Sequence, residues 1–248
     1  AGTLTFTDTG LAPATAYSYS VTAIDAVPNS SVPATLGVTT SATSLFAETF
    51  TAADASPWSA SWTTSATNGS VDVLGNAGRL AFNDVAGGFA RAQLTGAAAV
   101  ADSDLVLSYQ WSAGTARAYA NVWTRGSGGW LNSYRPNNGY GVQLQSDSAN
   151  VLVLRSVAGV QTTIATLTGA SPVGTAKKWV RVRTVGSTIY VRTWNDGSPE
   201  PATWTSSVTD TGVTAAGQVF LSLNRSSSNV GAKSISVDDL TLSAATGP

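Results

Sequence analysis

The stretch WVRVRTVGSTIYVRTW, residues 179–194, decides the fold of this chain. Apolar and polar residues alternate on both sides of Gly186, and this period of two predicts half-buried β-strands. Before the glycine the valines point to one side and Arg181 and Arg183 to the other, so this sheet has one face in water. After it, the alternation over residues 188–194 leaves open which side belongs to the core.

Runs of the same kind recur along most of the chain, separated by Gly, Asn, Asp and Ser. No helical stripe of useful length interrupts them. Short strands spaced at roughly ten residues predict a sandwich or a barrel. The clearest runs are residues 79–82, 105–109, 118–123, 140–144, 151–155, 162–167, 179–185, 188–194, 218–223 and 234–237.

A longer segment, residues 179–204, resembles concanavalin A-like and laminin-G-like jelly-roll domains in its repeated pattern of strand, turn and Trp. The sequences ETF at residues 48–50, GRL at 78–80 and VDDLTL at 237–242 fit the same frame, in which the first and last strands are neighbours. The resemblance implies an antiparallel jelly-roll β-sandwich over residues 44–248. Such domains occur in bacterial extracellular proteins and in minor tail proteins of their phages.

The first part of the chain alternates in two further runs, residues 3–7 and 17–23, which predict strands. The pattern LAPATAYSYSVTAID at residues 11–25, continued through residues 32–40, resembles the later strands of a fibronectin type III domain. The resemblance implies that residues 1–43 are the C-terminal strands and linker of such a domain, with Tyr17 forming its tyrosine corner.

The predicted fold class is therefore all-β, with a partial fibronectin type III (immunoglobulin-like) sandwich followed by the jelly-roll sandwich. Three strands with an open face cannot bury enough surface to fold alone. We expect residues 1–40 to dock on the following domain, to pair with another protein chain, or to be the ordered stub of a longer protein.

The charge and composition of the chain limit the classes of partner that it could bind. Thirteen basic and fourteen acidic residues give a net charge of −1, and the basic residues are scattered, which argues against a nucleic acid or an anionic membrane as partner. No stretch approaches the ~18 apolar residues that would insert into a membrane. Charged residues make up only 11% of the chain, whereas Thr, Ser, Gly and Ala abound, which is typical of secreted modules. We expect an extracellular protein or one on a virion surface.

The sequence contains few residues that could catalyse a reaction. The chain has no His and no Cys, which excludes Ser-His-Asp, Cys-His and histidine-zinc sites. A glycosidase needs two carboxylates, but the only glutamates are Glu48 and Glu200, and Glu200 stands between two prolines. Tyr134, Arg135 and Tyr140 are the one grouping that a lyase could use. We predict that the chain is not an enzyme.

Aromatic residues give the best candidate for a binding site. A polar loop is predicted over residues 124–139, with rings on and around it and with Asn and Arg beside them. An aromatic ring can stack on the apolar side of a pyranose while amides bind its hydroxyls. The alternative is that these rings cap the edge of the sandwich. The predicted ligand-binding residues are Trp123, Trp130, Asn132, Tyr134, Arg135, Asn137, Asn138 and Tyr140.

The other tryptophans are interpreted as structural. Trp58 and Trp62 follow a proline closely, and Trp194 and Trp204 bracket a proline-rich turn. Large rings in such places anchor loops against sheets.

An acidic pair, Asp238 and Asp239, interrupts the alternation near the end of the chain and predicts a β-bulge. The jelly-roll resemblance also implies a structural Ca²⁺ with one carboxylate near the last strand and one near the first, here Asp238 and Glu48. The alternative is a plain bulge with hydrogen-bonded carboxylates, because calcium needs about six or more oxygen ligands.

From these observations we expect a non-catalytic extracellular binding module that recognises a polysaccharide or a cell-surface glycan. The alternative is a structural or host-adsorption protein, such as a minor tail protein of a phage, in which the sandwich contacts other proteins. A polysaccharide-degrading enzyme is the third and least favoured reading.

Overall fold

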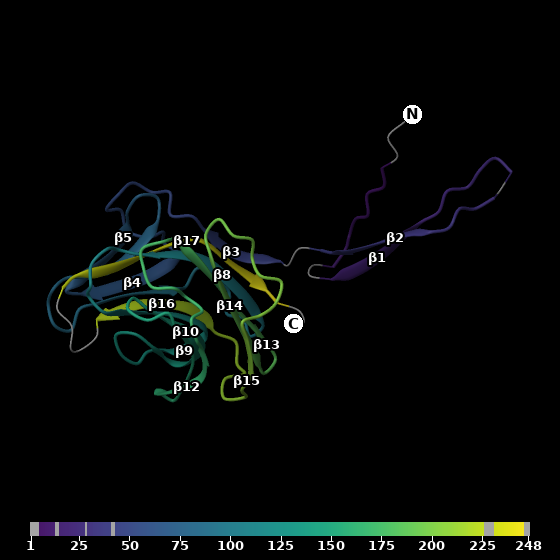
Figure 1. Cartoon of the computed structure of the whole chain (residues 1–248). Helices are drawn as coiled ribbons and strands as arrows, with labels where there is room; N and C mark the ends of the chain where they lie inside the picture. The colour runs from purple at the N-terminus through teal and green to yellow at the C-terminus, as the bar shows by residue number, and fades with distance from the viewer. Residues whose placement is uncertain (1–4, 13–14, 28, 41–42, 226–230, 246–248) are drawn as a thin grey trace. The chain divides into compact units, whose positions relative to one another are not determined.

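A computed structural model of the chain describes residues 5–12, 15–27, 29–40, 43–225 and 231–245. The chain divides into two compact units, Ala1–Thr43 (unit 1) and Ser44–Pro248 (unit 2) (Figure 1). Every regular element in the described residues is a β-strand, which confirms the all-β prediction. None of the described residues forms a helix long and apolar enough to span a membrane.

Unit 1 contains an antiparallel pair of strands, β1 (Ala16–Val21) and β2 (Ala34–Thr39). The hydroxyl of Tyr17 accepts a hydrogen bond of 2.9 Å from the Ala12 amide, the bond expected of a tyrosine corner. Residues 5–7 lie outside any strand, so that part of the predicted first strand is wrong, and residues 3–4 lie outside the described residues. The assignment of unit 1 to the fibronectin type III family stays a prediction.

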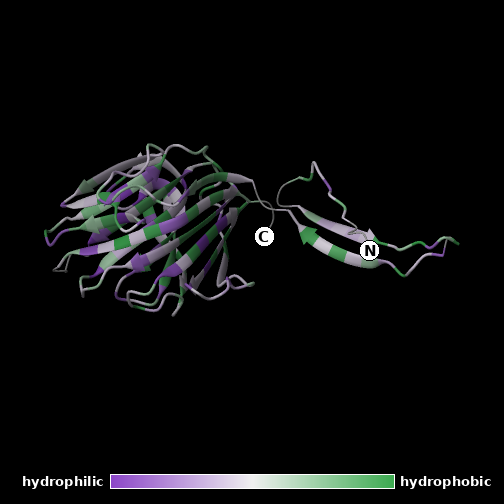
Figure 2. Cartoon of the chain, turned by 90° about the horizontal axis from the view of Figure 1, so that it is seen from above, coloured by the Kyte–Doolittle hydropathy of each residue, from purple (hydrophilic) through white to green (hydrophobic). Residues whose placement is uncertain are grey.

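Unit 2 consists of two antiparallel sheets. The seven-stranded sheet has the order β12-β11-β10-β9-β16-β7-β4, and the eight-stranded sheet is β15-β14-β13-β8-β17-β6-β5 with β3 paired to β17. Hydrophobic and hydrophilic residues alternate along many of these strands (Figure 2). The bounds are β3 Ser44–Glu48, β4 Trp62–Thr67, β5 Gly69–Val73, β6 Gly78–Phe82, β7 Phe89–Leu94, β8 Ser103–Trp111, β9 Ala118–Trp130, β10 Pro136–Gln145, β11 Val151–Val157, β12 Val160–Leu167, β13 Lys178–Val185, β14 Thr188–Asn195, β15 Ser206–Thr209, β16 Gln218–Arg225 and β17 Lys233–Ala244.

The jelly-roll frame predicted for unit 2 is confirmed. Its first strand, β3, pairs with its last, β17, so that Glu48 lies opposite Leu240. The core lies between the two sheets, and on β14 it takes Ile189 and Val191, while Arg192 stays on the outer side. The alternation alone left open which side of residues 188–194 faces the core, and the structure shows that it is the side of Ile189 and Val191.

A cluster of rings fills one part of the core. Trp58 and Trp62 are both buried and meet edge to face with their centroids 5.2 Å apart. Phe50 packs against Trp58, and the Trp58 ring nitrogen donates a hydrogen bond of 2.7 Å to the Asp72 carbonyl. Both tryptophans are structural, as interpreted from the sequence.

The predicted loop over residues 124–139 is wrong. Strand β9 continues to Trp130 and β10 begins at Pro136, so only residues 131–135 connect them. The glycines that suggested a loop lie in an irregular strand pair instead. A Cβ on Gly126 would lie 2.3 Å from the Phe220 ring, so this strand needs glycine for close packing.

A β-bulge in the middle of β9 places Arg125 inside the sandwich. The register of β9 shifts against both of its neighbours here, and Arg125 has a left-handed φ of 50°. Without the bulge, the alternation that points Trp123 outward would also point Arg125 outward. The bulge turns the arginine inward, and its side chain is only 1% exposed.

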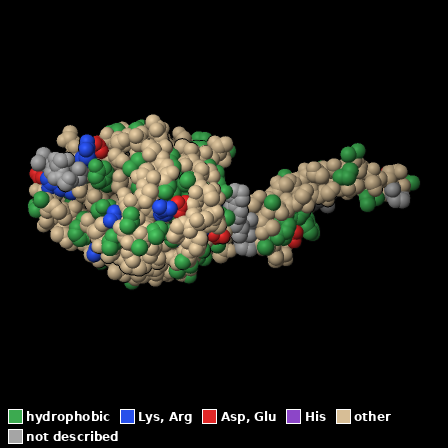
Figure 3. Space-filling model, turned by 90° about the horizontal axis from the view of Figure 1, so that it is seen from below, with side chains coloured by type: hydrophobic (Ala, Val, Ile, Leu, Met, Phe, Trp, Pro, Cys, Tyr) green, Lys and Arg blue, Asp and Glu red, His purple; other side chains and the backbone are tan. Residues whose placement is uncertain are grey.

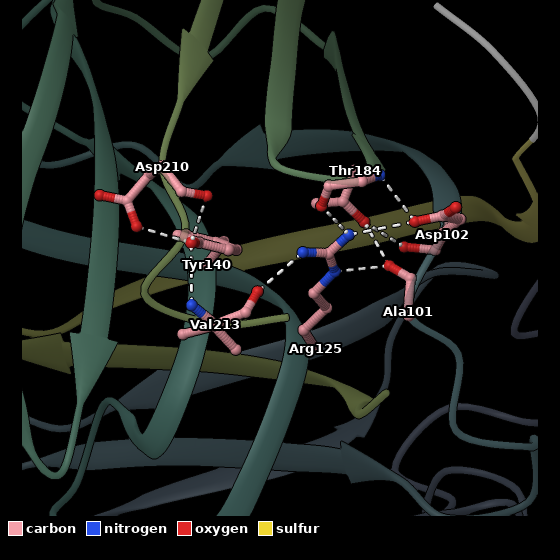
Figure 4. A network of polar contacts seen from close by, with 9 residues as sticks. Ala101, Asp102, Arg125, Tyr140, Thr184, Asp210 and Val213 are labelled. Atoms are coloured by element: carbon pink, nitrogen blue, oxygen red, sulfur yellow. Dashed lines mark hydrogen bonds and ion pairs between the residues drawn. The ribbon is translucent and has the colours of Figure 1, made fainter. Parts of the chain in front are cut away.

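Four groups satisfy the buried guanidinium (Figure 4). It donates hydrogen bonds to the carbonyls of Ala101, Val213 and Gly186, and it pairs with Asp102 at 3.1 Å. These groups lie before β8, after β15 and in the turn between β13 and β14. Arg125 therefore ties β9 to a turn of the eight-stranded sheet and to two connections that join the two sheets, β7–β8 and β15–β16.

Tyr140 and Asp210 form a second polar cluster, which also contacts the connection at Val213. The Tyr140 hydroxyl donates a 2.6 Å hydrogen bond to Asp210 and accepts one of 2.9 Å from the Val213 amide (Figure 4). Burial tends to raise the pKa of Asp210, but the hydrogen bonds from Tyr140 and the Gly212 amide and the charge of Arg155 lower it overall. Burial also raises the pKa of Tyr140, which keeps the phenol protonated as a donor.

We expect Arg125→Ala to destabilise the protein by about 3–5 kcal/mol, because it leaves several buried carbonyls without a donor. The control is Arg117→Ala, since Arg117 forms an ion pair with Asp147 at the surface and is half exposed. That variant should cost less than about 1 kcal/mol. Urea unfolding of both variants measures the difference, and equal losses would contradict the assigned role of Arg125.

Candidate functional site

The outer face of the seven-stranded sheet carries a band of polar side chains near its centre. On β9 the residues that face away from the core include Tyr119 and Asn121, because Ala118, Ala120 and Val122 point inward. On β16 the neighbours of these two residues are Asn224 and Ser222, respectively. On β10, Gln143 lies opposite Asn121. Register and alternation thus bring side chains from three strands onto one surface.

Three amides on this face form a hydrogen-bonded chain, which we call the amide row: Gln143, Asn121 and Asn224. Gln143 Nε2 donates to Asn121 Oδ1 at 3.1 Å, and Asn121 Nδ2 donates to Asn224 Oδ1 at 3.3 Å. Asn121 is buried, whereas the two outer amides are partly exposed. Among the described residues, Gln143 Oε1 and Asn224 Nδ2 have no hydrogen-bond partner. The row therefore ends in one acceptor and one donor that a ligand can use.

The connection between β9 and β10, residues 131–135, folds back onto the same face, and we call it the cap loop. The Tyr134 carbonyl accepts hydrogen bonds from Trp123 Nε1 at 3.0 Å and from the Ser222 hydroxyl at 2.9 Å. Within the loop, Asn132 Oδ1 accepts the amide hydrogens of Tyr134 and Arg135, both at 3.1 Å. The loop is thus held in one conformation against the sheet.

Arg91 on β7 fixes the other side of the cap loop. It donates one hydrogen bond to the Asn132 carbonyl at 2.9 Å and another to Ser65 on β4 at 2.7 Å. Its guanidinium also lies 5.1 Å from the centre of the Trp130 ring, within the range of a cation–π contact. Burial lowers the pKa of Arg91, yet an arginine stays charged at neutral pH.

Four of the predicted binding residues come together here: Trp130, Asn132, Tyr134 and Arg135. All four are partly exposed. The Arg135 guanidinium lies 5.5 Å from the Tyr134 ring, and Trp130 packs edge to face on Phe220 with centroids 4.8 Å apart. The pattern of rings beside amides thus predicted residues that lie together on the surface, and their role in binding stays a prediction.

Two further rings of the predicted site have no exposed surface for a ligand. Trp123 and Tyr140 are both completely buried, so the expectation that they face a ligand is wrong. Trp123 packs with Phe220 and Leu154 beneath the cap loop, and Tyr140 points into the polar network around Asp210. Their contacts are those of structural residues.

Asn137 and Asn138, on β10, belong to a different local contact. The Asn138 side-chain oxygen accepts the Ala158 amide at 2.9 Å, and the Asn137 carbonyl accepts the Gly159 amide at 2.8 Å. Both residues hold the turn between β11 and β12 rather than the cap loop. Their assignment to a ligand stays a prediction.

Sequence reasoning missed Arg91 and the amide row. Residues 89–94 read FARAQL, an alternation that places Arg91 on an outer face but does not reveal its neighbours. Arg91 and Asn132 are separated by 41 positions, and Asn121 and Asn224 by 103. Only the strand order brings them together.

The residues considered for catalysis do not form one cluster. Tyr140 is buried at Asp210, while Tyr134 and Arg135 lie on the cap loop. Glu200 is held by Arg181 at 2.6 Å and is also paired with Arg192, on the eight-stranded sheet.

The tryptophans near Glu200 pack on the outer side of the same sheet. Trp179 and Trp194 stack nearly parallel with centroids 5.7 Å apart, and Trp204 lies 4.2 Å from the Arg192 guanidinium. These contacts agree with the structural interpretation of Trp194 and Trp204.

The bulge predicted at the acidic pair is confirmed. Asp239 has a left-handed φ of 50°, and the register of β17 against β8 shifts between Asp238 and Thr241. Glu48 is engaged elsewhere, because it accepts the Ser59 hydroxyl at 2.7 Å and the Phe50 amide at 3.3 Å.

The surroundings of these carboxylates do not fit a calcium ion well. The described residues contain no group of three or more acidic side chains that could hold a metal, and the Lys177 ammonium lies 3.1 Å from Asp239. Calcium needs several oxygen ligands, and a neighbouring ammonium repels it. The calcium site at Glu48 and Asp238 stays a prediction, and no role below depends on it.

Comparisons with known proteins place the fold. No family model and no curated protein sequence matches the chain. Among solved structures, the carbohydrate-binding module CBM66 from Bacillus subtilis matches with a TM-score of 0.52 and 15% identity, over 74% of this chain and 96% of that one.

Two further structures match in the same way. The exoplasmic/lumenal domain of VIP36, in a form bound to Ca²⁺ and Man3GlcNAc, has a TM-score of 0.56 and 14% identity over 77% of this chain and 88% of that one. A Bacillus licheniformis β-glucanase has a TM-score of 0.55 and 10% identity, over 81% and 98%. At such identities the matches show the jelly-roll fold alone.

We expect Arg91→Met to loosen the cap loop. It removes both hydrogen bonds of Arg91, and the charged one to the Asn132 carbonyl is worth about 1.5–3 kcal/mol to the loop, while an unbranched side chain is kept. Amide exchange of Tyr134 and Arg135 should become at least about tenfold faster by hydrogen-exchange NMR. Arg79→Met, which breaks the ion pair with Asp72 on the other sheet, is the control and should leave these two amides unchanged. Unchanged exchange in Arg91→Met would contradict the assigned role.

Proposed function

We propose that this chain is a non-catalytic extracellular binding module that recognises carbohydrate, either a polysaccharide or a cell-surface glycan. The observation that carries the proposal is that the amide row lies on the same face as the cap loop, together with the partly exposed rings of Trp130 and Tyr134. Amides, hydroxyls and aromatic rings on one surface are the groups that bind sugars.

The chemistry of the face suits a neutral, hydroxyl-rich ligand. Each sugar hydroxyl both donates and accepts hydrogen bonds, and so does each amide side chain. The row ends in the Gln143 oxygen and the Asn224 nitrogen, one of each kind. Figure 3 shows one face of unit 2 on which charged side chains are few and scattered among uncharged ones. A neutral glycan needs no charged surface.

Preorganisation favours binding at this face. The amide row is hydrogen-bonded within itself, and the cap loop is fixed by Asn132, Ser222 and Arg91. Side chains that are already ordered lose little conformational entropy when a ligand arrives. A small set of contacts can then produce measurable affinity.

The structural neighbours support the same class of ligand without deciding it. Two of the matched structures are described as a carbohydrate-binding module and as a domain bound to Man3GlcNAc, and the third is a glucanase. The absence of His and Cys from the sequence, and the ion pairs of Glu200, favour binding over hydrolysis.

A glycan array tests the proposal. We expect at least one polysaccharide or glycan to bind, and Tyr134→Ala or Gln143→Ala to weaken that binding about tenfold through loss of a ring face or an amide. Trp130→Ala should have the same effect. The control is Tyr190→Ala, which removes a partly exposed ring from the eight-stranded sheet.

The folded state of each variant is checked by circular dichroism. No binding across diverse glycans would count against the proposal. Equal losses in Tyr134→Ala and in the Tyr190→Ala control would place the ligand elsewhere.

A structural or host-adsorption role, as in a phage tail or a surface assembly, is the second candidate. The observation that favours it is the apolar face of the β1–β2 pair, on which Tyr19 lies opposite Leu36. On this face Val21 is 69% exposed and Leu36 62%. An apolar strand pair open to solvent favours association with another chain.

Light scattering coupled to size exclusion tests this candidate. If unit 1 assembles through its apolar face, the protein is an oligomer at micromolar concentration. Leu36→Asp should then disperse it, while Thr35→Asp, on the opposite face of β2, should leave it assembled. A monomer at every concentration contradicts the assembly role and agrees with the binding module.

A further inference from the structure

A pocket of about 140 Å³ opens on the eight-stranded sheet, away from the face proposed above. It is bordered by the turn at Gly75–Ala77 between β5 and β6, by Ser108 and Gln110 on β8, and by Lys177 and Asp238. Val237, which lies between the pocket residues Ser236 and Asp238 on β17, is buried in the core, so these two side chains point to the outer side. The pocket therefore lies on the outer side of the sheet, and its volume has room for a few water molecules or one small ligand.

The bulge on β17 leaves a carboxylate oxygen without a partner at this pocket. Asp238 Oδ1 is shielded from solvent and has no hydrogen-bond partner among the residues that the structure describes, while the side chain as a whole is 24% exposed. Burial, together with the nearby Asp239, raises the pKa of Asp238 despite the hydrogen bond from the Asp239 amide and the charge of Lys177. Because Oδ1 has no exposed surface, a hydroxyl in the pocket reaches this carboxylate through Oδ2, the oxygen that lies 3.9 Å from the Lys177 ammonium.

A donor lies beside that acceptor. The Lys177 ammonium is 3.9 Å from Asp238 Oδ2 and 3.1 Å from Asp239 Oδ2, and it lies 5.7 Å from the centre of the Trp179 ring. An ammonium has three donors, so Lys177 can hold Asp239 and still donate to a ligand. Gln110 Nε2 donates one hydrogen bond, to the Thr175 carbonyl at 2.8 Å.

We propose that this pocket is a second ligand site, which takes one residue of a neutral polyhydroxylated ligand such as a sugar ring. Asp238 accepts a hydrogen bond from one hydroxyl, and Lys177 donates to the neighbouring one. An adjacent acceptor and donor of this kind match two vicinal hydroxyls.

Other classes of ligand fit this pocket less well. The two aspartates repel an anion. The ammonium repels a metal ion, and no cluster of three acidic groups in the described residues would hold one.

This site is independent of the amide row, because its residues come from β8, β17 and the β5–β6 and β12–β13 connections. It extends the proposed function, since a module with sites on both sheets can contact a glycan at two places. Two weak sites on one molecule raise the overall affinity for a polymeric ligand.

Amide chemical shifts of the whole chain in ¹⁵N-labelled form test the proposal. The probes are methyl β-glucoside, methyl β-galactoside, methyl α-mannoside and myo-inositol, each up to 50 mM to cover the roughly millimolar affinities of small polar ligands. At least one probe should shift the amides of Gln110, Lys177 and Ser236. Asp238→Asn should weaken this binding at least tenfold, and Lys177→Met should do the same.

Gln143→Ala, on the amide row, is the matched control and should leave the shifts at the pocket unchanged. Asp238→Asn preserves the size of the side chain, and Lys177→Met gives a second, independent variant; thermal unfolding verifies that both are folded. Shifts confined to the cap loop and amide row, no shifts with any probe, or undiminished pocket shifts in both folded variants would overturn the second site. A loss of glycan-array binding in Gln143→Ala alone would be evidence about the amide row and the cap loop. It would neither support nor overturn the site at the pocket.

Discussion

The buried guanidinium of Arg125 is the interaction on which the rest of unit 2 depends. A charge removed from water is tolerated only when its donors are satisfied, and here three backbone carbonyls and Asp102 satisfy them. Gly186 belongs to a turn of the opposite sheet, and Ala101 and Val213 belong to connections between the two sheets. The sheets therefore cannot separate at this end without leaving the buried charge unpaired. The bulge that turns Arg125 inward also sets the path of β9 toward the cap loop.

The two outer faces differ in chemistry although both come from alternating strands. On the seven-stranded sheet, neutral amides bind one another and the aromatic cap loop covers Trp123 and Ser222. On the eight-stranded sheet, arginines and tryptophans pack with Glu200, and a second bulge leaves Asp238 beside a pocket. In both sheets a bulge changes where a side chain points.

Alternation was enough to predict most of the strands and the bulge at the acidic pair, and the jelly-roll frame was implied by the resemblance to jelly-roll domains. The sequence reasoning also grouped Trp130, Asn132, Tyr134 and Arg135, which remain close to one another on the surface, and their role in binding stays a prediction. It failed over residues 124–139, where glycines indicated a loop although they permit an irregular strand pair. Periodicity also cannot tell a ring that faces solvent from one that a loop covers, which is why Trp123 was placed among the binding residues.

The sequence by itself determined that this protein is built of β-strands, that it lacks the residues of His- and Cys-based catalysis, and that its charge is close to neutral. These properties follow from local period and from composition, which need no knowledge of contacts. Only the tertiary structure decided that Arg125 lies in the interior, that Arg91 holds the cap loop, and that Asn121 and Asn224 form one row. Each of these depends on strand order and register, because hydrogen bonds between distant residues form only after the sheets bring their strands side by side.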